Sequence, residues 1–132
     1  MKKSEGQSNE FTSNIKIVVK GSIFSAAITL VLLFIYSCIL TFTNVSDSTI
    51  PVIVIILTII SILMGSSLST NKIKSKGLIN GALVGGIYLC TIYMVSSFLN
   101  TGFTFNLYSI IMLGTGILAG GIGGVMGVNM KR

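Results

Sequence analysis

The sequence contains no histidine and no tryptophan, and only three of its 132 residues are acidic. The acids are Glu5, Glu10 and Asp47, and all three lie outside the long apolar runs. A membrane-embedded hydrolase needs a nucleophile with a nearby base, or metal ligands, at depth. A small proton-coupled exporter needs a carboxylate in the membrane. We therefore expect a protein that is not an enzyme, has no cofactor or metal site, and is not such an exporter.

Charge of either sign is also scarce. Charged residues make up 9% of the chain and hydrophobic residues 52%, with a mean hydropathy of +0.92. About a quarter of the residues are charged in ordinary soluble domains, so a soluble fold is excluded. The apolar residues occur in runs of roughly 20, the length that crosses a bilayer as a helix. The composition predicts an integral membrane protein with one domain.

Four apolar runs without a charged residue are predicted to be the membrane-spanning helices. They cover residues 21–42, 50–68, 78–99 and 107–128. The connections are short, which makes consecutive helices antiparallel. We predict an all-α integral membrane four-helix bundle running up-down-up-down, with one membrane domain over 21–130 and a short polar, basic tail over 1–20.

Pro51 lies where the first turn of the second helix is expected. Proline is favoured there because the first helical N–H groups have no partner within the helix. Asp47, Ser48 and Thr49 lie just before it, and their side chains are candidates for the helix cap. This segment therefore predicts a sharply defined start of the second helix.

The nine cations occupy alternate connections only. Besides Lys2 and Lys3 they are Lys16, Lys20, Lys72, Lys74, Lys76, Lys131 and Arg132. Cytoplasmic segments of membrane proteins are enriched in lysine and arginine, so both termini and the central connection are predicted to be cytoplasmic. Because this rule accounts for the whole net charge of +6, we expect no nucleic-acid partner.

Glycine, in contrast, is abundant, with 15 residues, and half of the stretch "GTGILAGGIGGVMG" is glycine. At about 100° per residue, one face of the fourth helix carries Gly116, Gly120, Gly123 and Gly127. Gly124 borders this face, whereas Gly114 and Gly121 lie on the opposite side, which predicts neighbours on both sides of the helix. Small residues four apart also occur on the other helices: Gly77, Gly81 and Gly85; Ser61, Gly65 and Ser69; Gly21, Ser25 and Thr29.

Small residues at this spacing let membrane helices approach closely, because lipid provides no hydrophobic force that drives them together. Two interpretations remain open. The glycine faces are either static packing contacts, within one bundle or between subunits, or a seam that slides or bends in a gate. Asn80, the one strongly polar side chain well inside a run, is expected to bond across helices.

Several of these motifs resemble the YrzE-like family of small four-span membrane proteins from Gram-positive bacteria. The resemblance covers the second to fourth runs. Its motifs are Gly65, Lys76–Gly77, Gly81, Gly85, Tyr88, the glycine-dense segment 120–127 and the final Gly127-Val128-Asn129. Ser66 and Ser69 stand where glycine is common in that family. The resemblance implies the fold, the orientation and a bacterial plasma membrane, but no activity.

Two functions remain as hypotheses. One is a structural or accessory component, embedded in the lipid bilayer, that packs through its glycine faces against another membrane protein or a second copy. The alternative is a subunit of an oligomeric transporter or channel for a small solute or ion. A pore should carry polar residues along one face through mid-membrane, and cores such as "ITLVLLFI" and "PVIVIILTII" have almost none. This favours the accessory role.

Overall fold

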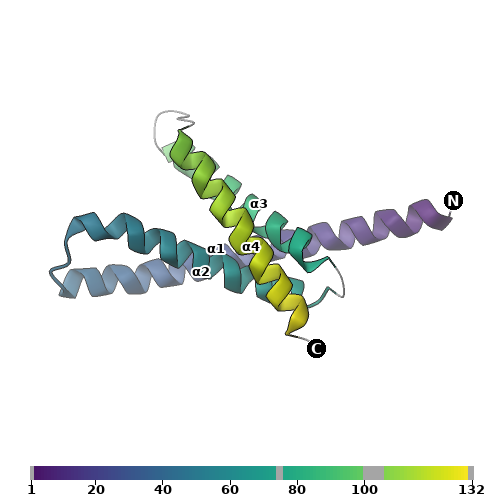
Figure 1. The fold of residues 1–132 in the computed structure, drawn as a ribbon, viewed down its shortest axis with the longest axis horizontal. Coiled ribbons are helices and arrows are strands. Elements are labelled where there is room, and N and C mark those ends of the chain that lie inside the picture. The colour runs from purple at the N-terminus through teal and green to yellow at the C-terminus, as the bar shows by residue number, and fades with distance from the viewer. Residues whose placement is uncertain (1, 74–75, 100–105, 131–132) are drawn as a thin grey trace.

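The described part of the chain forms four long helices in the computed structural model (Figure 1). The structure describes residues 2–73, 76–99 and 106–130. The elements are α1 (Lys2–Phe42), a short 3-10 helix η1 (Asp47–Thr49), α2 (Ile50–Thr70), α3 (Gly77–Leu99) and α4 (Leu107–Asn129). All four α-helices are long and apolar enough to cross a membrane. This confirms the predicted all-α, four-helix architecture.

Helix α1 is much longer than the predicted first span. It begins at Lys2 and contains 41 residues, which corresponds to about 61 Å at 1.5 Å per residue, twice the hydrocarbon thickness of about 30 Å. The predicted polar tail is therefore helical, and its N-terminal end projects beyond the rest of the bundle (Figure 1). The segment contains no proline, and Thr12 Oγ1 donates to Ser8 O within it.

The start of α2 differs in part from the prediction. Pro51 does lie in the first turn of the helix. However, the cap residue Thr49 has helical backbone angles and makes no side-chain cap hydrogen bond. The prediction of a side-chain cap is wrong because the 3-10 turn runs directly into α2, with Thr49 N donating to Ser46 O at 3.0 Å. Ser48 Oγ instead lies 3.0 Å from Ser46 Oγ.

The helices form two hairpins, α1–α2 and α3–α4, which cross each other near the middle of the molecule (Figure 1). Gly21 and Gly65 face Ser69 and Ser25, respectively, so α1 and α2 run in opposite directions. Helices α3 and α4 are also antiparallel, because the start of α3 lies against the end of α4. Away from the crossing, the turn between α1 and α2 separates from the adjoining ends of α3 and α4.

Small and hydroxyl side chains surround a small core of Ile62, Val84, Tyr88 and Leu89, and most large apolar side chains cover the outside. The buried polar residues are Ser22, Ser25, Thr29, Thr58, Ser61, Ser66, Thr70 and Asn80. In contrast, Leu30, Phe34 and Leu118 are each about 70% exposed. A soluble protein places its large apolar side chains inside, whereas lipid-facing helices meet through small residues. The packing therefore agrees with the apolar composition of the four helices.

Candidate functional site

The glycines of α3 and α4 pack backbone against backbone. An added Cβ at Gly77 would lie 2.5 Å from the carbonyl oxygen of Gly124. A Cβ at Gly81 would contact the carbonyl of Gly120, and a Cβ at Gly85 would contact the carbonyl of Gly116. Real Cβ atoms do not come that close to backbone atoms, so none of these positions has room for a methyl group without a shift of the helices.

A second glycine contact joins α4 to α2. A Cβ at Gly123 would lie 2.6 Å from Leu63 O, and one at Gly127 would meet the carbonyl of Ser67. On the other side of α2, Gly65 faces the side chain of Ser25 on α1. The predicted glycines of three helices are thus in contact with other helices of the same chain.

The contacts on the two sides of α4 differ from those predicted. Gly124 does not border the face but lies in the contact with α3, against Gly77 at the start of that helix. Gly114 is exposed, and no described atom lies within 4 Å of a Cβ added there. Gly121 is buried, and a Cβ added there would lie at an ordinary distance of 3.7 Å from Leu78 O of α3. The expected second neighbour is therefore absent at Gly114 among the described residues, and at Gly121 it is α3 again. Instead α2 and α3 share the two flanks of one broad glycine face.

Hydroxyl groups connect the helices where the glycines bring them together. Ser66 Oγ donates to Gly120 O at 2.6 Å, and Thr70 Oγ1 donates to Gly124 O at 3.2 Å, which joins α2 to α4. Ser69 Oγ donates to Ile17 O on α1 at 2.6 Å. From the sequence alone, Ser66 is identified only as a departure from glycine, and Ser69 as such a departure and as one of the small residues of α2. In the structure they are donors between helices, a role that glycine cannot fill.

The interior hydroxyls of α1 and α2 do not form an open polar path. Ser25, Thr29, Thr58 and Ser61 each donate to the carbonyl four residues earlier in their own helix. Ser25 and Ser61 are fully buried. Hydroxyls that are bonded to backbone and covered by side chains leave no donors along which water or ions could move. Around Ser25 and Ser61 the interior is therefore closely packed.

A cavity of about 430 Å³ opens between the two hairpins on the side where they separate. Its lining includes Thr29, Thr58, Tyr88, Ser96, Tyr108 and Ser109, with apolar side chains between them. At the buried end, the hydroxyls of Thr29 and Tyr88 lie 2.7 Å apart, while Tyr108 is more than half exposed. Ligand pockets have typical volumes of 300–1,000 Å³. No charged side chain of the described residues lines it, so it suits an uncharged group.

Little in the sequence indicates this cavity, because its lining comes from all four helices. Thr29 and Thr58 are hydroxyl residues in the middle of long apolar runs. Their position at mid-span is the signal that was available. We refer to this space as the inter-hairpin cavity.

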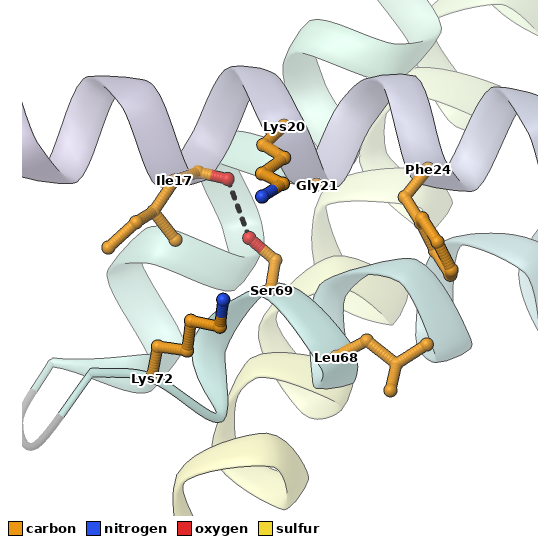
Figure 2. A pocket seen from close by; sticks show the side chains of 7 residues that line it. All are labelled: Ile17, Lys20, Gly21, Phe24, Leu68, Ser69 and Lys72. Atoms are coloured by element: carbon orange, nitrogen blue, oxygen red, sulfur yellow. Dashed lines mark hydrogen bonds between the residues drawn. The ribbon is translucent and has the colours of Figure 1, made fainter.

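Four of the described lysines, Lys16, Lys20, Lys72 and Lys76, lie toward one end of the bundle. Lys20 and Lys72 line a groove between α1 and α2 (Figure 2). Lys72 and Lys76 line a neighbouring polar pocket together with Glu10. Lys16 is exposed on α1, one turn before Lys20. The remaining predicted cations, Lys74, Lys131 and Arg132, lie outside the described residues.

Asn80 differs from its expected role. Its side chain is 5% exposed, and its Nδ2 atom has no hydrogen-bond partner among the described residues. The predicted bond across helices is therefore absent at this atom. A buried amide without a partner costs roughly 1–3 kcal/mol, which makes Asn80 an energetically unfavourable position, and the hydroxyl of Tyr36 is a second buried group without a partner among the described residues.

A family model described as "Protein of unknown function (DUF3792)" matches residues 14–127. The match covers all four spans, and it begins inside the helical extension of α1. Comparison with curated proteins and with solved structures found no match.

Proposed function

Since this chain belongs to the DUF3792 family of proteins of unknown function, its role has to follow from its own residues, and we propose a structural or accessory component of the plasma membrane. The observation that carries the proposal is the interior, in which glycine contacts and hydroxyl bonds connect the helices and leave no described charged side chain buried. Such an interior supports assembly without catalysis. In the proposed role the protein has no enzymatic activity and needs no cofactor.

We propose an up-down-up-down arrangement across the membrane with both termini in the cytoplasm. The support is the gathering of Lys20, Lys72 and Lys76 at one end of the bundle, because lysine-rich ends face the cytoplasm. The likeness to YrzE-like proteins of Gram-positive bacteria supports a bacterial plasma membrane as its location.

In this role the protein binds another membrane protein, which contacts it at the inter-hairpin cavity. The glycine faces are not available for this purpose, because the chain's own helices already occupy them. The cavity offers several hydroxyl groups and apolar walls, which suit a transmembrane segment with an uncharged polar side chain. The hydroxyl bonds argue against the alternative of a transporter or channel subunit, since Ser25, Thr29 and Ser61 are bonded to backbone carbonyls of their own helices.

Site-specific photo-crosslinking in intact membranes tests this role. A photoreactive phenylalanine at Ser109 lies in the cavity, whereas the same residue at Leu118 lies on an exposed face outside it. We expect a single protein adduct from Ser109 and none from Leu118. An adduct with a second copy would identify the partner as this same chain. Failure of Ser109 to form any protein adduct, together with solute flux through liposomes that contain the purified protein, would contradict the accessory role.

A further inference from the structure

A groove at the lysine-rich end of the bundle lies between α1 and α2 and has a volume of about 180 Å³. Figure 2 shows its seven lining residues, and we call it the lysine groove. Figure 2 shows the side chain of Lys20, from α1, and that of Lys72, from the turn after α2, both directed toward the bond between Ser69 Oγ and Ile17 O. Two cations from different segments of the chain therefore line the same small space.

No acidic side chain among the described residues lines the lysine groove. Glu10 lines the neighbouring polar pocket, together with Lys72 and Lys76. Two ammonium groups in one space repel each other unless an anion lies between them. The groove is thus complementary in charge to a ligand with a negative group.

The other end of the lysine groove is apolar and continues along the bundle. Phe24 lines it and also lines a second groove of about 310 Å³ between α1 and α2. The walls of this second groove are entirely aliphatic or aromatic, for example Ile28, Val31 and Met64. The two spaces together offer a cationic head and a long apolar track that starts at Phe24 and runs away from the lysines.

We propose that the lysine groove binds one anionic phospholipid, with its phosphate between Lys20 and Lys72 and one acyl chain along the track past Phe24. The depth is suitable, because Lys20 directly precedes the first apolar run and Lys72 follows α2 by two residues. Lysines at the end of a span lie at the level of the lipid head groups. A free phosphate satisfies only the cationic part of the groove and leaves the apolar track empty.

Native mass spectrometry of the purified full-length protein in mild detergent tests this proposal, with phosphatidylglycerol and phosphatidylcholine of identical acyl chains as the added lipids. We expect one tightly bound phosphatidylglycerol and much weaker binding of phosphatidylcholine. Removing one lysine should weaken phosphatidylglycerol binding about fivefold, since one basic residue near a membrane surface contributes about that factor in affinity. Lys20→Gln and Lys72→Gln are the test variants.

Lys16→Gln is the matched control. It removes the same charge from a residue that lies one helical turn before Lys20 and does not line the groove. All three lysines are exposed, so the variants should keep the thermal stability of the parent, which a melting curve checks. An equal loss of binding in Lys16→Gln would show that general surface charge attracts the lipid and would overturn the site. Binding of glycerol 3-phosphate, a soluble head group without acyl chains, as tight as that of phosphatidylglycerol would overturn the lipid as its occupant.

Discussion

Replacing Gly120 by leucine tests whether the contact between α3 and α4 holds the bundle together. A Cβ at this position would meet the carbonyl of Gly81 and lie 3.0 Å from Gly85 N. These are backbone atoms, so they cannot turn aside as a side chain can. Gly114 provides the matched control on the same helix, because among the described residues nothing lies near enough to contact a Cβ there.

The expected free-energy changes follow from these surroundings. At Gly120, alanine gains up to about 1 kcal/mol of helix propensity but overpacks a tight contact, which costs about 1–3 kcal/mol. Leucine adds three more carbon atoms and separates the two backbones, which also removes the bond from Ser66 Oγ to Gly120 O, worth about 1 kcal/mol. We expect a modest loss of stability for Gly120→Ala and a loss of at least about 3 kcal/mol for Gly120→Leu.

Reversible unfolding in mixed detergent, followed by circular dichroism or by a thermal shift, measures these differences. Gly114→Ala and Gly114→Leu should be as stable as the parent or slightly more stable, because they gain helix propensity and meet no neighbour. If Gly120→Leu were as stable as Gly114→Leu, the glycine face would not be a packing contact. The glycines would then serve flexibility, and the transporter hypothesis would gain support.

Three further predictions use other parts of the structure. The two native cysteines are both free, so they are first removed. An impermeant thiol reagent applied to whole cells should then label a cysteine placed at Ser48 and leave one placed at Ser75 unlabelled. The reverse pattern would overturn the proposed orientation. Asn80→Leu should raise the unfolding free energy by roughly 1–3 kcal/mol, because it removes a buried amide nitrogen without a partner; a loss of stability would reveal a bonded or functional amide. Tyr88→Phe should cost about 1 kcal/mol through the lost hydroxyl bond at the end of the inter-hairpin cavity, whereas Tyr108→Phe at its exposed mouth should be nearly silent in the same unfolding assay.

The sequence predicted the existence of the four membrane helices because long apolar runs are a direct physical requirement of crossing lipid. It did not predict the helical extension of α1, since residues 2–20 have no apolar periodicity and hydropathy reports only the part that lies in the membrane. It also failed at the start of α2, where Thr49 has a residue type suited to a cap but is already helical.

The glycine spacing predicted which residues lie at helix contacts, but it did not assign their partners. Gly120 and Gly123 are three residues apart and lie on one predicted face, yet the first meets α3 and the second meets α2. Periodicity within one helix describes a direction relative to that helix only. Which neighbour lies in that direction depends on how the hairpins cross, and no local pattern contains that information. The inter-hairpin cavity was missed for the same reason.

The glycine pairs between α3 and α4 also fix the register of this hairpin. Sliding α4 by one helical turn, about 5.4 Å, would move Gly120 from Gly81 to a neighbouring glycine and still leave most pairs intact. The series ends abruptly, however, with Met112 one turn before Gly116 and Val128 one turn after Gly124. A slide in either direction would force one of these side chains into a gap that is now only as wide as two backbones. The α3–α4 hairpin therefore has a single allowed register.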